Sequence, residues 1–286
     1  MNFSSKNIDV VIPTLCGKKL YKTIKSLSLG SLKPRKIICV YYYKFNFSIF
    51  KKHFKNIYFI KSNVRNQVQQ RIEGFRHVKS NYILQLDDDI IFEKNTLLNL
   101  MKNKIKLGKK SLVGPVYLDL NKKSIHNAES NKKVLTNIYK YFICGALYGI
   151  NKIGTITSLG LAYGVNANIK KKIVRCQWLP GGCILFSKNL LKNSFDKFIF
   201  DKKSFCEDIF FSIQRTKIKF KHFTITNSLV YTERNKEQFN FKTYCDEIKI
   251  RQFLLKYTMG NKIRFYLWAL LELLNRSVFK KLYSRN

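Results

Sequence analysis

The first 116 residues alternate two kinds of pattern, and this alternation constrains the fold more than any other feature. Short runs of β-branched and aromatic residues predict strands, and apolar residues spaced three or four positions apart predict helices. Strands that alternate with helices favour an α/β fold, in which helices cover both faces of a mostly parallel sheet. The predicted strands are residues 8–12, 36–43, 57–60, 82–86 and 112–116, and the predicted helices are residues 18–29, 64–78 and 95–105.

The rest of the chain is less regular. The dipeptide Gly181-Gly182 follows a proline and predicts a turn that leads into a strand. We expect one α/β domain over residues 1–235 and a helical extension over residues 236–286. Residues 121–133 predict a polar loop, residues 142–165 a mobile region over a binding site, and residues 207–215, 239–257 and 262–283 helices.

The charge of the chain predicts anionic partners. Lys and Arg number 54 against 17 Asp and Glu, which gives a formal net charge of +37. Such an excess suits nucleic acid, an acidic membrane surface or phosphorylated substrates. The alternative is that many lysines simply lie on solvated faces, as a biased base composition of the coding sequence would also produce.

Cysteine usage and the apolar runs bear on location. The seven cysteines are irregularly spaced and include no C-x-x-C pair, which argues against a disulfide framework or a zinc site. We find no signal peptide and no run that approaches the ~20 apolar residues of a membrane span. We therefore expect a cytoplasmic protein, with a peripheral place on the inner face of the membrane as the second option.

Three aspartates, Asp87, Asp88 and Asp89, directly follow the predicted strand 82–86. Adjacent carboxylates raise each other's pKa, and a divalent cation such as Mg²⁺ or Mn²⁺ removes that cost. On an extended segment Asp87 and Asp89 point to one side and Asp88 to the other, so Asp87 and Asp89 form the better metal pair. The alternative is a solvated turn or an acidic cluster at a helix N-terminus.

A second acidic pair, Glu207-Asp208, opens a predicted helix. Acids favour the first turn of any helix, which is the structural alternative. Together with the aspartate triplet, however, the pair could supply a general base that is separate from the metal ligands.

Five motifs occur in an order that resembles family 2 glycosyltransferases with the GT-A fold. Together they span about residues 8–232. They are Val10-Val11-Ile12-Pro13-Thr14, the segment Asn66 to Gly74, the segment Tyr82 to Asp89, Trp178-Leu179-Pro180-Gly181-Gly182-Cys183, and Glu207-Asp208 followed by Ser212 and Arg215.

The resemblance implies a nucleotide-sugar donor and Mn²⁺ or Mg²⁺ as the cofactor. Asp87 and Asp89 would hold the cation, and the cation would stabilise charge on the departing diphosphate. The residues implied in nucleotide-sugar binding are Pro13 and Thr14 at the base, Arg71 at the nucleotide or diphosphate, and Asp87 and Asp88.

On the acceptor side, the resemblance implies that Asp208 is the general base and that Glu207 positions the substrate. Trp178 could stack on a sugar ring, and Gly181 and Gly182 would let the substrate approach the backbone. The structural alternatives are that Trp178 belongs to the core and that Arg71 is a surface residue of its helix.

Three departures from the family pattern affect the expected site. Tyr41-Tyr42-Tyr43-Lys44 stands where the family often has an acidic residue that contacts the base, and Ile72 replaces an asparagine. The late histidine of the metal site is missing, and Tyr231 aligns best with it, while Glu233 is a candidate oxygen ligand. The third metal ligand therefore stays open.

The predicted last helix is amphipathic and basic. Basic residues flank its apolar stripe, which suits an anionic membrane interface. The alternative is a helix that packs on the domain and keeps a solvated basic face. The stripe consists of Ile263, Leu267, Leu270, Leu271, Leu274, Val278 and Leu282, and the flanking residues are Lys262, Arg264, Arg276, Lys280, Lys281 and Arg285.

The sequence thus favours an inverting, metal-dependent hexosyl- or deoxyhexosyltransferase of cell-surface polysaccharide synthesis, acting on a glycan or lipid-linked acceptor. A basic nucleic-acid-binding protein would explain the charge but not the clustered acids, and no HTH, RRM or KH signature occurs. A metal-dependent nucleotidyltransferase ranks third, because no glycine-rich phosphate loop stands near the N-terminus.

Overall fold

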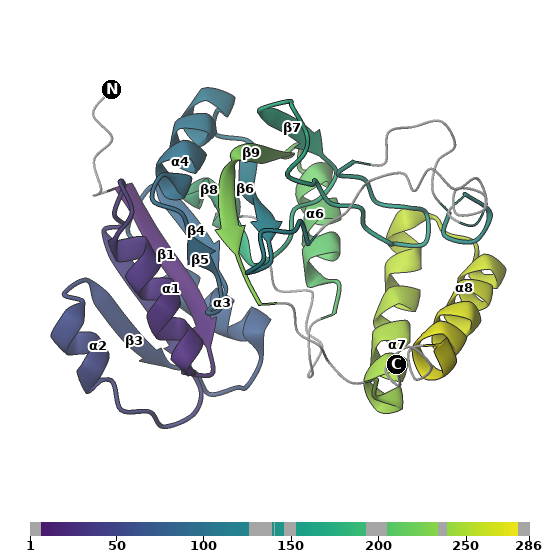
Figure 1. Cartoon of the computed structure of the whole chain (residues 1–286), viewed down its shortest axis with the longest axis horizontal. Helices are drawn as coiled ribbons and strands as arrows, with labels where there is room; N and C mark the ends of the chain where they lie inside the picture. The colour runs from purple at the N-terminus through teal and green to yellow at the C-terminus, as the bar shows by residue number, and fades with distance from the viewer. Residues whose placement is uncertain are drawn as a thin grey trace.

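The computed structural model describes residues 7–125, 139, 141–145, 153–192, 205–233 and 239–279, without the side chains of residues 278 and 279. Across these residues the chain forms a mixed α/β fold around a nine-stranded sheet (Figure 1). The sheet is mostly parallel in its first half, and helices flank it, as the strand–helix alternation predicts.

Four parallel strands make up the N-terminal half of the sheet, in the order β3-β2-β1-β4. Helices α1 and α3 lie on opposite faces of these strands. The elements are β1 (Ile8–Thr14), α1 (Lys18–Ser28), β2 (Lys36–Tyr41), α2 (Ser48–His53), β3 (Ile57–Lys61), α3 (Gln67–Arg76) and β4 (Tyr82–Leu86).

The second half of the sheet is mixed. Strand β8 runs antiparallel to both β4 and β6, whereas β9 runs parallel to β6. Short strands β5 and β7 pair antiparallel with β9. The elements are β5 (Ile91–Phe92), α4 (Thr96–Leu107), β6 (Ser111–Leu118), β7 (Ile173–Cys176), β8 (Cys183–Ser187), the 3₁₀ helix η2 (Lys188–Lys192), α6 (Glu207–Lys217) and β9 (Lys221–Tyr231).

Strand β1 shows how the sheet is buried on both faces. Val10 and Ile12 pack in one hydrophobic cluster with side chains of α1 and α4. Val11, which points to the other face, packs in a second cluster with Phe75 of α3. Burial on both faces explains why the sequence of β1 is a continuous apolar run rather than an alternation.

Two antiparallel helices close the described chain, α7 (Phe241–Thr258) and α8 (Lys262–Leu274), and a short π-helical turn, η3 (Asn275–Phe279), follows. Helix α7 packs Ile250 and Leu254 against α6. The predicted end of the last helix, residues 280–283, lies outside the described residues, as do residues 126–133 of the predicted loop and residues 146–152 of the predicted mobile region. No helix within the described ranges is long and apolar enough to cross a membrane.

Candidate active site

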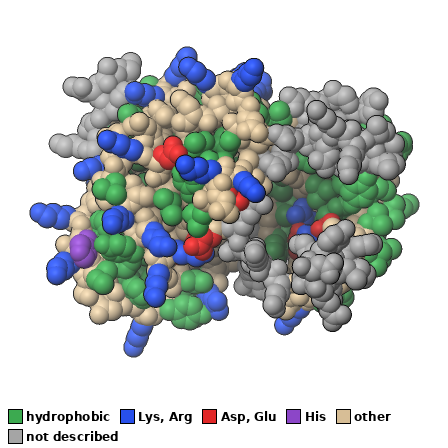
Figure 2. All heavy atoms as spheres, viewed as in Figure 1, with side chains coloured by type: hydrophobic (Ala, Val, Ile, Leu, Met, Phe, Trp, Pro, Cys, Tyr) green, Lys and Arg blue, Asp and Glu red, His purple; other side chains and the backbone are tan. Residues whose placement is uncertain are grey.

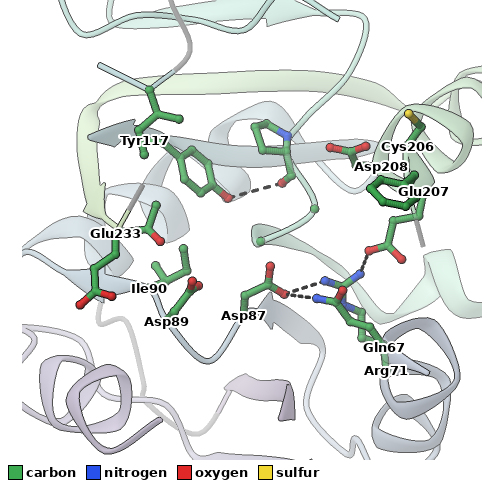
Figure 3. A pocket seen from close by; sticks show the side chains of 16 residues that line it. Gln67, Arg71, Asp87, Asp89, Ile90, Tyr117, Cys206, Glu207, Asp208 and Glu233 are labelled. Carbon is green, nitrogen blue, oxygen red and sulfur yellow. Dashed lines mark hydrogen bonds and ion pairs between the residues drawn. The ribbon is translucent and has the colours of Figure 1, made fainter. Parts of the chain in front are cut away.

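A cavity of about 660 Å³ lies where the end of β4, the turn before β8 and the start of α6 meet (Figure 3). Acidic side chains from separate parts of the sequence reach it together with one buried arginine. The lining residues are Gln67, Arg71, Asp87, Asp89, Ile90, Tyr117, Ile125, Pro180, Gly181, Gly182, Phe205, Cys206, Glu207, Asp208, Thr232 and Glu233.

The aspartate triplet is divided in the way an extended segment predicts. Asp87 and Asp89 line the cavity, and Asp88 turns away from it. The Asp88 carboxylate accepts a hydrogen bond from Oγ1 of Thr14 (2.5 Å), and Thr23 donates to the Asp88 carbonyl (2.9 Å). Asp88 therefore fixes the loop after β4 to β1 and α1, and it does not line this cavity.

Burial and repulsion affect the triplet. The pKa of Asp88 is raised, first by burial and then by the charge of Asp87. The pKa of Asp89 is raised, first by burial and then by Asp87 and Asp88. A cation in the cavity would offset the burial and the repulsion at Asp89, which lines the cavity together with Asp87.

Arg71 links the two acidic groups of the cavity. It is buried on α3, and its guanidinium donates to Oδ1 of Asp87 (2.6 Å) and to Oε1 of Glu207. Figure 3 shows the guanidinium between these carboxylates. Burial alone would lower the pKa of Arg71, but Glu207 and Asp87 raise it above its ordinary value. The structure thus rejects a surface position for Arg71 and gives it a bridging geometry.

The pair Glu207-Asp208 forms the first turn of α6. Glu207 is buried and held by Arg71, whereas the Asp208 carboxylate accepts from main-chain amides, those of Ile209 (2.9 Å) and Gly181. Burial raises the pKa of both carboxyls. Asp208 is consequently the better proton acceptor of the two, because no cation is bonded to it among the described contacts.

The glycine turn before β8 forms one wall of the cavity. The Asp87 amide donates to the Gly182 carbonyl (2.8 Å), and Nε2 of Gln85 donates to the Gly181 carbonyl (2.5 Å). A Cβ atom on Gly182 would lie 3.0 Å from Oδ2 of Asp87 and 3.4 Å from the Tyr117 hydroxyl. The missing side chain therefore keeps space open next to Asp87.

The donor set partly fits a divalent cation. Asp87 and Asp89 both face the cavity, and Oδ1 of Asp87 is engaged by Arg71 and by Gln67 (2.9 Å), so Oδ2 is its available oxygen. No group of three or more His, Cys, Asp or Glu side chains that could hold a metal occurs in the described part of the chain. Two carboxylates suit an ion that keeps water and phosphate oxygens as its other ligands, as Mg²⁺ does.

The two candidates for a third ligand differ in position. Tyr231 donates its hydroxyl to Oε1 of Glu93 (2.5 Å) and does not line the cavity. Glu233 does line it, and its carboxylate forms an ion pair with Lys19 (2.9 Å), which lowers the pKa of Glu233. Glu233 is thus the only one of the two that shares the cavity with Asp89.

Four predicted site residues do not line this cavity: Pro13, Thr14, Asp88 and Trp178. Asp88, expected to bind the nucleotide sugar, is bonded to Thr14 instead. Pro13 and Thr14 are buried at the end of β1, and the Thr14 hydroxyl is bonded to Asp88. Trp178 is buried with Ile209 and Leu254, and its Nε1 donates to the Tyr163 carbonyl (3.0 Å). The structure therefore places Trp178 in the core, as the structural alternative predicts.

Sequence reasoning missed several residues of the cavity wall. Tyr117 lies at the end of β6 and donates to the Pro180 carbonyl at 3.5 Å. Its position just past a predicted strand, at the same sheet edge as Asp87, was the available signal. Phe205 and Cys206 stand next to the acidic pair, but nothing in their residue types indicates a site.

The fold is of the GT-A class. A crystal structure of GalNAc-T7 with UDP, GalNAc and Mn²⁺ matches with a TM-score of 0.60 and 14% identity, over 98% of this chain. The match covers 58% of the GalNAc-T7 chain, so the present chain spans little more than half of that length.

The model of "Glycosyl transferase family 2" matches residues 9–175, which is more than half of the chain. The chain belongs to that family. The matched stretch includes Arg71 and the aspartate triplet, and it ends before Gly181 and Asp208. No curated protein matches the sequence.

Proposed function

We propose that the protein transfers a sugar from a nucleotide-sugar donor to a hydroxyl group of a glycan or lipid-linked acceptor, with inversion at the anomeric carbon. The observation that carries the proposal is the convergence of Asp87 and Asp89 with Asp208 on one cavity. Family membership supports glycosyl transfer, and the UDP, GalNAc and Mn²⁺ of the GalNAc-T7 structure support a nucleotide-sugar donor and a divalent cation.

In the proposed reaction the acceptor oxygen attacks the anomeric carbon of the donor. The new C–O bond forms as the bond to the diphosphate breaks, and the diphosphate leaves with the electron pair. Asp208 takes the proton of the acceptor hydroxyl. A single displacement of this kind inverts the anomeric configuration.

The neighbouring residues hold these groups in place. Arg71 fixes Glu207 and Oδ1 of Asp87, while the side-chain-free wall at Gly182 lets the donor approach Asp87. Asp89 and Oδ2 of Asp87 would hold Mn²⁺ or Mg²⁺. Such an ion, when bound, supplies charge stabilisation for the departing diphosphate.

The base assignment is tested after a donor screen. A panel of uridine, guanosine and thymidine diphosphate sugars, each with Mg²⁺ or Mn²⁺, is assayed for hydrolysis to find the donor. Asp208→Asn should then lower kcat by about a hundredfold or more, the usual size of a general-base contribution, with donor affinity retained.

Asp246→Asn is the matched control, because Asp246 lies on α7 and does not line the cavity. Unchanged turnover of Asp208→Asn would reject Asp208 as the base. Loss of turnover in both variants would show that the effect is not specific to the cavity.

The metal assignment needs a separate binding experiment. Asp89→Ala should remove the increase in affinity for the nucleoside diphosphate that Mn²⁺ produces in the wild type, because one of two protein ligands is lost. Titration calorimetry with and without Mn²⁺ measures this directly. An equal increase in the variant and the wild type would contradict the role of Asp89.

A further inference from the structure

Helix α8 has two apolar faces, and only one of them packs on the protein. Phe265, Trp268 and Ala269 are buried against the rest of the domain, and the Ala269 carbonyl accepts a hydrogen bond from the Tyr244 hydroxyl of α7. The predicted stripe lies largely on the other side. One face of α8 therefore packs on the domain, as one of the two predicted alternatives has it, while most of the predicted stripe stays exposed.

The second face is exposed. We call it the outer face of α8. Its residues recur at helical spacing along three turns, so they lie on one side of the helix. They are Ile263 (81% exposed), Tyr266 (50%), Leu267 (44%), Leu270 (54%) and Leu274 (44%). Val278 and Leu282, which would extend this face, lie outside the described side chains.

The turn between α7 and α8 carries a further exposed apolar side chain. Met259 adopts a left-handed conformation at the end of α7 and is 96% exposed. Figure 2 shows hydrophobic side chains gathered on the right of the molecule, the side where Figure 1 places α8. Several exposed apolar side chains in a row on one helix mark an interaction surface rather than chance exposure.

Charge around the outer face indicates what covers it. Lys256 and Lys262 are exposed, Arg264 is half-buried, and residues 256–271 contain no acidic residue. The first acid after them, Glu272, is neutralised by Arg276 (2.7 Å). A second copy of the chain would bring the same cations to the contact, and the net charge of +37 opposes such self-association.

We propose that the outer face of α8, together with Met259, binds the surface of an anionic lipid bilayer. The helix would lie in the plane of the interface, with its leucines and Ile263 among the acyl chains. Lys256 and Lys262 would then meet anionic headgroups. This surface lies outside the catalytic cavity, so the proposal does not depend on the proposed reaction.

Vesicle sedimentation tests the surface. We expect the full chain to sediment with vesicles of phosphatidylcholine and phosphatidylglycerol, and much less with pure phosphatidylcholine. The triple variant Ile263→Ser, Leu267→Ser, Leu270→Ser should weaken binding by roughly tenfold or more, because the apolar area that enters the bilayer is lost. Leu29→Ser is the control, since Leu29 is 66% exposed at the C-cap of α1, away from α8 in the sequence.

A fluorescence reporter separates lipid contact from a folding defect. The native Trp178 and Trp268 are buried, so a tryptophan introduced by Leu267→Trp supplies a distinct signal. Its emission should shift to the blue on adding anionic vesicles, and brominated acyl chains should quench it.

The proposal is overturned by no binding, by equal binding to neutral vesicles, or by unchanged binding of the triple variant. It is also overturned if light scattering shows a dimer that the triple variant dissolves. That result would assign the outer face to a second copy of the chain.

Discussion

At the scale of single residues, Arg71 is the group on which two carboxylates of the cavity depend. It is buried, and it ion-pairs with Asp87 and Glu207. Removing one partner of a buried ion pair leaves uncompensated charge and costs about 3–5 kcal/mol. Arg71→Met should therefore lower the free energy of unfolding by that amount and reduce transfer strongly.

A lysine cannot bridge the two carboxylates with the planar fork of a guanidinium, so Arg71→Lys should recover stability better than activity. Urea unfolding and the transfer assay measure the two effects. Arg76→Met is the control, because Arg76 lies on the same helix and its ion pair with Glu73 is exposed. Full activity in Arg71→Met would show that Asp87 and Glu207 need no bridge.

The raised pKa of Asp208 has a consequence for stability. The folded state binds the proton of this carboxyl more tightly than the unfolded chain does, so ionisation above the ordinary pKa of aspartate destabilises the fold. Asp208→Asn should therefore raise Tm at pH 7. The gain should shrink as the pH falls and disappear below about 3.9, the reference pKa of Asp, where both states are protonated.

Differential scanning fluorimetry of the wild type and Asp208→Asn across this pH range measures the effect. Because the pKa of Asp208 is raised, the acidic limb of the pH–activity profile should lie at a higher pH than the pKa of an ordinary aspartate would give. If Asp208→Asn has a lower Tm than the wild type at pH 7, the predicted direction of the change in Tm is wrong.

The sequence could predict which aspartates share a side, because alternation along an extended segment is a local property. The resemblance to family 2 glycosyltransferases could also predict that Asp208 shares a site with Asp87, because both residues belong to motifs of that family. The burial of Trp178 could not be predicted in this way. It depends on Leu254 of α7, which is distant in the sequence and packs there only in the folded chain.

At the scale of an element, the seating of α3 on the sheet sets the position of Arg71. Gly74 lies one turn after Arg71, and a Cβ atom there would fall 2.4 Å from Cγ1 of Val11 and 3.0 Å from Cγ2 of Val40. Alanine would therefore push α3 away from β1. Overpacking costs about 1–3 kcal/mol, and the better helix propensity of alanine returns about 1 kcal/mol.

Gly74→Ala should consequently lose up to roughly 2 kcal/mol of stability by these estimates and lose activity through the displaced Arg71. Gly17→Ala is the packing control, because only chain neighbours lie within 4 Å of a Cβ at that position. Gly17 is the N-cap of α1, where alanine has its own cost, so the two variants are compared in transfer activity. Equal activity of the two variants would show that a Cβ at residue 74 does not displace Arg71.

Most elements of the parallel half were predictable, because each one carries its own periodicity. The strand Tyr82–Leu86 matches the prediction residue for residue. Strand β9 was not predicted, although it is the centre of the mixed half. Its sequence contains Lys221, Asn227 and Ser228, and it becomes a strand through pairing with β6, β5 and β7. For α8, the periodicity shows that apolar faces exist but not which one packs.

At the scale of the whole molecule, the acidic cavity does not explain the net charge of +37. On the face shown in Figure 2, Lys and Arg side chains lie singly across the surface rather than in one stripe. Dispersed charge of this kind raises the local concentration of any polyanion, including an anionic membrane and a nucleotide-sugar donor, without specifying one.

Dispersed charge predicts nucleic-acid binding that is non-specific and dependent on salt. Filter binding with duplex DNA should show affinity at 50 mM salt that falls roughly a thousandfold or more by 200 mM, because each neutralised phosphate releases counterions. Asp208→Asn should bind DNA like the wild type, since the cavity takes no part. Nanomolar, sequence-dependent binding that persists at 200 mM salt would instead favour a nucleic-acid-binding protein, and the acidic cavity would then require another explanation.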